Sequence, residues 1–287
     1  MNWPAQGIHH AVPFADYRAD DITQADTYLT ATGKAVSKSL ICDFIADPGA
    51  WKASPPKKQT AAMRGGSLFD CLLTEPETFE SRYAVNPFDS FRSKAAQDWR
   101  DSAEENGLSV IAQDALEAAQ AQIAAVYGHP DAARLINYSQ KQVAFRHRTK
   151  HCFAAKGLID LLPEDPSDGI VDIKTCEPSA LESRRNLARH IADWQYHIQA
   201  GCYTEGYSFA SGEERIRFRF IFVTSKPPYR VAVVELPFRA VMLGADQYRA
   251  GVNRFAECLE ANKWPSIWDG EVEVDLPEYT YNEGGEP

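Results

Sequence analysis

Acidic and basic side chains lie close together in the stretch GLIDLLPEDPSDGIVDIKT, residues 157–175. Two apolar runs each carry a carboxylate, Asp160 in the first and Asp172 in the second, and Lys174 follows two positions after Asp172. The polar segment 163–169 between the runs has the composition of a hairpin loop. Side chains two positions apart share one face of a strand, so Asp172 and Lys174 point the same way. Antiparallel pairing could then bring Asp160 beside Asp172.

This combination of charges suits phosphodiester chemistry. Two carboxylates at one point repel each other unless a cation lies between them. Oxygen ligands suit Mg²⁺, for which Mn²⁺ can substitute. A lysine ammonium beside them could orient a water molecule or stabilise developing negative charge. The residues therefore indicate metal-assisted hydrolysis, whereas a surface hairpin with an ordinary Asp172–Lys174 ion pair is the alternative for this tripeptide alone.

A row of polar side chains follows in the segment DWQYHIQAGCYTEGY, residues 193–207. Gln195, Gln199 and Tyr203 recur at four-residue intervals, which places them on one face of a helix. Two amides and a phenol in line suit contacts to phosphate oxygens or to water at a metal. A solvated helix face is the alternative.

The elements that position these residues are read from the hydrophobic pattern. Strands are expected over 142–149, 152–162, 169–175, 215–225 and 229–236, with helices over about 179–209 and 238–261. Further helices are expected from Ser37, through about Leu73, and over 109–129. The order indicates an α/β fold, a mixed central sheet flanked by helices, preceded by a helical N-terminal region.

The chain divides into three parts by composition. Residues 1–36 have weak periodicity and are expected to be irregular. Residues 37–265 are expected to form one domain, with a helical part over 37–138 and a catalytic core over 139–265. Residues 266–287 form an acidic tail, since the last 19 residues hold seven Asp or Glu and no Lys or Arg.

Composition restricts the class of protein. A net charge of −10 over 287 residues argues against a protein that coats nucleic acid with its whole surface. A local basic groove is still compatible, because salt screens opposing charge beyond about 10 Å. Six cysteines without a CxxC pair match no zinc or iron–sulfur pattern. With no secretion signal and no apolar run of about 20 residues, a cytoplasmic protein without a membrane partner is expected.

Three basic clusters are candidates for phosphate contacts, with ordinary solvated charge as the alternative. The first lies within the expected long helix, the second near the first core strand, and the third alternates along a later strand. They are Arg184, Arg185 and Arg189; Arg146, Arg148 and Lys150; and Arg215, Arg217 and Arg219.

Together these motifs resemble the PD-(D/E)xK nuclease superfamily. The order GxxD, hairpin, DxK and a helix with QxxxY looks like its RecB-type branch, here as Gly157–Asp160, Asp172–Lys174 and Gln199–Tyr203. More narrowly, the chain is similar to the RecE or exonuclease VIII group, which shares this core with phage lambda-type exonucleases. VSKSLICDFIADPGAWK is similar to the N-terminal helix of that group, and GSLFDCLLTEPETF resembles its G-x-x-x-H-x-x-L-L-x-E-P-x-x-F segment. The resemblance covers about 35–265.

Two positions depart from the family pattern. Asp70 stands where the family commonly has a metal-binding His, and Gln142 is the nearest residue to a frequent Glu. Because a carboxylate also binds Mg²⁺, Asp70 is expected to supply a further oxygen ligand, with a solvent-facing side chain as the alternative. The resemblance thus implies a metal site of Asp70, Asp160, Asp172 and Ile173.

The resemblance implies a restriction-endonuclease-like fold and Mg²⁺-dependent exonuclease activity on linear duplex DNA ends, from 5′ to 3′, in recombination or phage DNA processing. Asp160, Asp172, Lys174, Gln199 and Tyr203 would be the catalytic set, with Gln195 contacting DNA. A single-strand annealing recombinase as partner and a homo-oligomeric ring come from the family alone. The alternatives are a single-strand-specific or endonucleolytic relative and a non-catalytic DNA-binding module. The intact Asp160, Asp172 and Lys174 argue against the last.

Overall fold

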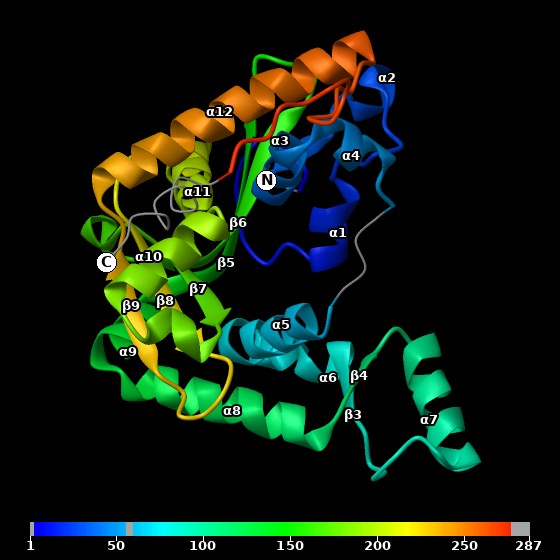
Figure 1. The fold of residues 1–287 in the computed structure, drawn as a ribbon. Helices are drawn as coiled ribbons and strands as arrows, with labels where there is room; N and C mark the ends of the chain where they lie inside the picture. Colours follow the sequence, from blue (N-terminus) through cyan, green and yellow to red (C-terminus); the bar gives the residue numbers. More distant parts are fainter. Residues whose placement is uncertain (1–2, 56–59, 277–287) are drawn as a thin grey trace, which may run out of the picture.

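A mixed seven-stranded sheet forms the centre of the molecule in the computed structural model, which describes residues 3–55 and 60–276 (Figure 1). Its main path runs β1-β5-β6-β7-β8-β9, and β2 pairs with β6 outside that path. The strands are β1 (Gly7–His9), β2 (Ala35–Ser37), β5 (Ser139–Arg148), β6 (Ala154–Pro163), β7 (Ile170–Cys176), β8 (Phe218–Thr224) and β9 (Val231–Glu235). The expected α/β class with a mixed central sheet is confirmed.

Helices cover both faces of this sheet. One face packs against α3 (Lys38–Ala46), α11 (Tyr196–Ser211) and α12 (Phe238–Ala261), and the other against α5 (Ala61–Thr74), α8 (Gln113–Gly128) and α9 (Pro130–Asn137). A small lobe beyond α5 holds the second sheet, β3 (Tyr83–Val85) with β4 (Ser109–Ile111), and α7 (Lys94–Glu105). The remaining helices are α1 (Phe14–Ala19), α2 (Tyr28–Ala31), α4 (Pro48–Ala53), α6 (Phe79–Arg82) and α10 (Arg184–Asp193), with the 3₁₀ turns η1 (Pro76–Thr78), η2 (Pro166–Asp168) and η3 (Pro178–Leu181).

The two-residue period of the strands fills two separate cores. On β8, Phe218, Phe220 and Phe222 enter the core under α11 and α12, whereas Ile221 and Val223 enter the core over α5, α8 and α9. On β7, Val171 and Ile173 enter the second core. Asp172 and Lys174 therefore point toward α11, as their spacing requires.

The N-terminal 36 residues differ from the irregular segment expected there. β1 pairs antiparallel with β5, and β2 pairs parallel with β6 over residues 154–156. Since β5 occupies the other edge of that part of β6, β2 lies on the side where β7 would otherwise continue. The segment is thus an integral part of the central sheet. Of the acidic tail, residues 277–287 lie outside the described residues.

Buried charges fasten this segment to the sheet. Lys156 of β6 is fully buried, and its Nζ lies 2.8 Å from Asp21 Oδ1 and donates to the Tyr17 carbonyl. Arg146 of β5 is also buried, and its Nε lies 2.9 Å from Asp20 Oδ2. Buried charges are tolerated only when paired in this way.

The long helix expected over 179–209 is two helices. α10 ends at Asp193 and α11 begins at Tyr196, because Gln195 between them has a left-handed backbone with φ of 53°. Neither Gly nor Pro marks this break in the sequence. Likewise, the helix expected over 109–129 begins only at Gln113, since residues 109–111 form β4.

Within residues 3–55 and 60–276, none of the helices combines the length and apolar character that crossing a bilayer requires.

The buried charge network yields a stability prediction. Lys156→Met removes the buried cation of Asp21, which keeps its ion pair with the exposed Arg18, so the free energy of unfolding is expected to fall by roughly 3 kcal/mol in urea titrations, the lower end of the range for a broken buried pair. Lys226→Met is the matched control, because the Lys226–Glu177 pair is exposed and is expected to contribute about 0–1 kcal/mol. Equal losses in the two variants would show that the network does not fasten the N-terminal segment.

Candidate active site

The strands that carry the acidic residues separate at the site. Leu161 and Val171 are the pair that joins β6 to β7. Two residues further along β7, the Ile173 backbone N–H donates to Asp160 Oδ2 at 2.9 Å. The Asp160 carboxylate therefore accepts a hydrogen bond that a backbone carbonyl of the neighbouring strand would accept in a regular sheet. Asp160 thereby bridges the opening between the strands, and the inserted β2 fills the opening farther along.

The backbone around Asp160 is distorted on its other side as well. Pairing of β5 with β6 is continuous except opposite Asp160, where Gln142 has a left-handed backbone with φ of 52°. Ile159 and Leu161, which should share a face, enter opposite cores. Irregularities of this kind re-aim side chains next to functional sites. Here the irregularity turns Asp160 toward the separated end of β7.

Asp172 is held by two neighbours. Gln199 Nε2 of α11 donates to Asp172 Oδ1 at 2.5 Å, and the Lys174 ammonium forms an ion pair with Asp172 Oδ2. Asp172 is 2% exposed, and its Oδ2 has no hydrogen-bond partner beyond that ion pair within the described residues. The three residues thus form one buried polar unit between β7 and α11.

The charges at the site shift one another's protonation. Burial raises the pKa of Asp160 well above its ordinary value, and the neighbouring charge of Asp172 raises it further. Burial also raises the pKa of Asp70 to about 7, although Lys174 opposes this shift. Burial lowers the pKa of Lys174, but Asp172 and Asp160 outweigh it and the net shift is upward. Carboxylates therefore crowd the Lys174 ammonium.

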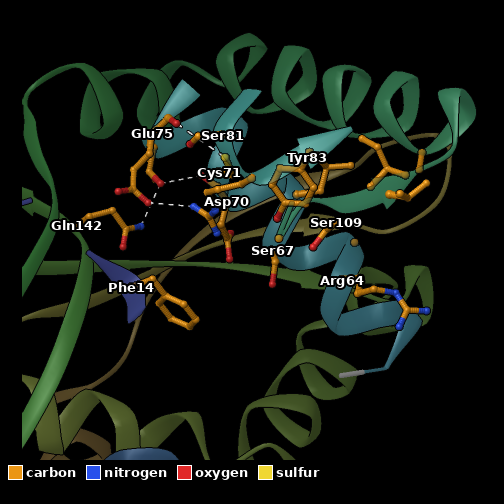
Figure 2. Close-up of a pocket in the computed structure, with 18 of the residues that line it drawn as sticks. Phe14, Arg64, Ser67, Asp70, Cys71, Glu75, Ser81, Tyr83, Ser109 and Gln142 are labelled. Atoms are coloured by element: carbon orange, nitrogen blue, oxygen red, sulfur yellow. Dashed lines mark hydrogen bonds and ion pairs between the residues drawn. The ribbon is translucent and has the colours of Figure 1, made fainter. Parts of the chain in front are cut away.

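A cleft of about 610 Å³ opens from these acids toward the small lobe. Asp70 on α5 and Asp160 both line it. Figure 2 shows Asp70 and Ser67 along α5, with Glu75 and Gln142 to one side and Tyr83 to the other. Asp70 is half-buried in this cleft, and burial raises its pKa, so its carboxyl does not lie on a freely solvated helix face.

The donor set fits a hard divalent cation. Asp160 and Asp172 offer carboxylate oxygens, and Ile173, which follows Asp172, offers a carbonyl oxygen 3.5 Å from Lys174 Nζ. The buried Oδ2 of Asp172 without a hydrogen bond and the raised pKa of Asp160 both indicate a place for positive charge. Within residues 3–55 and 60–276, no three His, Cys, Asp or Glu side chains form a ready-made cage. Mg²⁺ does not need such a cage, because one or two carboxylates together with water and substrate phosphate are enough to bind it. A direct bond from Asp70 stays a prediction.

Tyr203 lies one turn beyond Gln199 and rests on the strands. Its ring centroid is 5.6 Å from that of Phe145 and 6.3 Å from that of Phe218. A Cβ at Gly157 would lie 2.4 Å from Phe145 and 3.0 Å from Tyr203, so the glycine of GxxD makes room for both rings. Burial raises the pKa of Tyr203, and the charges of Tyr17, Asp172 and Asp160 add to the shift, so its hydroxyl lies near the acids without a hydrogen bond to them in the described part of the chain.

Gln195 does not share the helix face of Gln199. Because it precedes α11 in the left-handed conformation, the expected four-residue stripe begins only at Gln199. A role for Gln195 in binding DNA stays a prediction without that geometric support. Arg184, Arg185 and Arg189 are exposed on α10, so their proposed phosphate contacts also stay predictions.

The basic cluster of β5 is not at the site. Arg146 is buried and paired with Asp20, so the expectation that it contacts DNA is wrong. Arg148 is exposed, but it lies six residues along β5 from Gln142, roughly 20 Å away. The exposed Lys150 lies two residues beyond Arg148, just after β5.

The arginines near β8 stabilise the hairpin loop instead of forming a free basic face. Arg215 is buried against Glu213 and the Pro163 carbonyl. Arg219 pairs with both Asp168 and Glu235. Arg217 pairs with Glu235 as well. Each of these guanidinium groups already has an acidic partner.

Two residues at the site were not foreseen from the sequence. The Tyr196 ring lies beneath Lys174 Nζ, 5.4 Å from its centroid, and Lys38 Nζ lies 5.8 Å from the same centroid. Lys38 directly follows Ser37, the last residue of β2 and the N-cap of α3. A helix was expected to begin at Ser37, but nothing in the sequence indicated that β2 would bring Lys38 to β7.

Comparison with known proteins agrees with this architecture. The sequence profile of a family described as "PDDEXK-like domain of unknown function (DUF3799)" matches residues 44–273. A candidate exonuclease from Eubacterium rectale has a similar structure, with a TM-score of 0.58 and 13% identity over 96% of this chain and 100% of that one. A phage-related exonuclease from Haemophilus somnus gives a TM-score of 0.38 and 11% identity over 80% and 96%. No curated protein sequence matches.

The raised pKa of the buried acids leads to a prediction about pH and metal. The pKa of Asp70 rises from 3.8 to about 7 on folding, so stability without added ion is expected to fall as pH rises through that window. Mg²⁺ requires the deprotonated carboxylates, so the increase in Tm that it causes should be larger above pH 7 than below it.

Thermal melts with and without saturating Mg²⁺ measure this difference. Asp160→Asn should abolish most of the increase, whereas Asp98→Asn, which removes an exposed carboxylate on α7, should retain it. An increase that is the same on both sides of pH 7, or that survives in Asp160→Asn, would contradict a metal site at these acids.

Proposed function

The chain belongs to the PDDEXK-like family DUF3799, which confirms its resemblance to the PD-(D/E)xK nuclease superfamily, and we propose that it is a metal-dependent nuclease that hydrolyses phosphodiester bonds in DNA. The observation that carries the proposal is the buried unit of Asp172, Lys174 and Gln199 beside Asp160. A purely structural ion pair would not require a separated sheet and a distorted backbone around a second carboxylate.

Each residue has a role that its contacts suggest. Asp160, Asp172 and the Ile173 carbonyl would hold Mg²⁺, or Mn²⁺ in its place. The ion would supply charge to polarise the phosphate and to activate water. Lys174 is kept cationic by the neighbouring acids and would stabilise negative charge on the phosphate oxygens during attack. Gln199 would keep the Asp172 carboxylate in one orientation. Tyr203 would position the strands through its packing on Gly157 and, through its hydroxyl, could contact the phosphate.

We infer further that the substrate is linear duplex DNA, degraded from its ends in the 5′-to-3′ direction and in the context of recombination or phage DNA processing. This inference rests on the similarity of the sequence motifs to the RecE group. The two exonucleases similar in structure are too distant in sequence to assign activity. An annealing recombinase as partner, a ring assembly and a cytoplasmic location stay expectations from the sequence.

The first prediction for this function concerns the catalytic unit. Lys174→Ala and Asp172→Ala should lower the rate of DNA cleavage by orders of magnitude, because each removes charge that the reaction needs. Gln199→Ala and Tyr203→Phe should lower it less. Release of labelled nucleotides in Mg²⁺, with EDTA as the blank, measures these rates.

Lys226→Ala is the control for loss of a surface charge and should cleave at the unmodified rate. Circular dichroism of each variant checks that it is folded. If a folded Lys174→Ala protein cleaves at the unmodified rate, the assignment of the catalytic unit is wrong.

The second prediction concerns the substrate. Linear duplex DNA should be digested to short products, whereas covalently closed circles should stay intact, because an exonuclease requires a free end. Gel electrophoresis of both substrates in one reaction tests this directly. Nicking or linearisation of closed circles would favour the endonucleolytic alternative, and digestion of single strands alone would favour the single-strand-specific one.

A further inference from the structure

A second lysine lies across Tyr196 from the proposed catalytic lysine. Lys38 Nζ and Lys174 Nζ lie 5.8 and 5.4 Å from the centroid of the same ring. Lys38 is brought there by β2, which occupies the opening between β6 and β7 and continues directly into α3. The separation of β6 from β7, which makes room for Asp160 and Asp172, therefore also lets β2 place the Lys38 ammonium beside them.

Lys38 is a half-buried lysine without an ion-pair partner among the described residues, as are Lys52 and Lys141, which donate to backbone carbonyls. Lys38 differs from those two in its place beside Lys174. Its Nζ lies 3.4 Å from the Trp194 carbonyl oxygen, and the Cys42 thiol and the charges of Lys174 and Asp172 are further neighbours. Over residues 3–55 and 60–276, no carboxylate lies within ion-pair distance of it. By contrast, Lys34 pairs with Asp26 and Lys156 with Asp21. A half-buried ammonium next to a second ammonium is unfavourable until an anion approaches.

Trp194 presents a large aromatic surface next to this ammonium. It ends α10, is 62% exposed, and its ring packs near the His190 ring at 6.1 Å. The left-handed Gln195 that follows fixes the turn, and Lys38 donates to the Trp194 carbonyl. The exposed indole follows a helix with three exposed arginines, so a surface on which a base can stack and positive charge lie on one stretch of the chain.

We propose that Lys38 and Trp194 form a nucleotide-contact site beside the catalytic centre. Lys38 binds a DNA phosphate adjacent to the one that is cleaved, and Trp194 stacks on a base exposed at the end of the same strand. The phosphate supplies the anion that Lys38 lacks, and stacking accepts every base because each has an aromatic face. The site rests on the proposed nuclease function and deepens it, since it selects a nucleic-acid end without reading its sequence.

Binding of uncleaved DNA tests the site separately from catalysis. The probe is a fluorescently labelled duplex with a free end, titrated in EDTA and followed by anisotropy at several salt concentrations. Lys38→Gln should weaken binding and reduce the dependence of log Kd on log salt by about one unit of slope. Trp194→Ala should weaken binding roughly tenfold and leave that slope unchanged. Lys38→Arg should restore the slope.

Two matched variants serve as controls. Lys263→Gln removes the same charge from the exposed residue after α12, and Trp268→Ala removes an indole that is 64% exposed in the C-terminal segment. Both should bind DNA and cleave it as the unmodified protein does.

The outcomes separate the two proposals. If the unmodified protein cleaves DNA but Lys38→Gln and Trp194→Ala bind it as well as their controls, the nucleotide-contact site is overturned and the nuclease function stands. If the unmodified protein cleaves no DNA with Mg²⁺ or Mn²⁺, the nuclease function fails. Loss of binding in both variants with retained Tm supports the contact site, and loss of binding in the controls as well overturns it.

Discussion

The molecule is organised around the mutual repulsion of buried carboxylates. Asp160 and Asp172 are held in the low-dielectric interior, where like charges at close range raise the free energy steeply. Lys174 and Gln199 offset part of this free-energy cost for Asp172. The Ile173 N–H offsets part of the cost for Asp160. A site kept partly uncompensated in this way favours a bound cation, and the separation of β6 from β7 is the geometry that makes it possible.

Close packing of two helices fixes the amide that orients Asp172. A Cβ at Gly201 of α11 would lie 2.0 Å from the backbone of Ala245 in α12, and one at Gly244 would lie 1.8 Å from the backbone of His197. The two helices therefore touch backbone to backbone, which leaves α11 no freedom to shift along the sheet. Gln199 lies between His197 and Gly201, so its amide reaches Asp172 because α12 fixes the position of α11 over the sheet.

Much of the fold and part of the site followed from the sequence. Strand periodicity identified β5 to β9, and it placed Asp172 and Lys174 on one face toward the helix that carries Gln199. The positions of Gln195, Arg146 and Lys38 could not be predicted, because each depends on a non-local feature. Gln195 breaks a helix without Gly or Pro, Arg146 is buried by an ion pair with Asp20 126 residues earlier, and Lys38 is placed by a parallel pairing of β2 with β6. The two-residue period of the strand sequence also could not reveal that the alternation of side chains between the two faces of the sheet fails at Asp160.

The insertion of β2 between β6 and β7 has a consequence for how the protein matures during synthesis. β2 leaves the ribosome more than a hundred residues before its partner on β6, and the opening that it fills does not exist until β7 has formed. Pairing over such a sequence separation is slow, because the loop must close before any contact compensates its entropy. The acids, their lysine and the N-terminal strand therefore come together only after β7 has been made, more than a hundred residues after β2. A nascent fragment that ends before β7 thus lacks Asp172 and Lys174, so the proposed nuclease would be inactive at that stage, a safeguard that arises from the order of the elements along the chain.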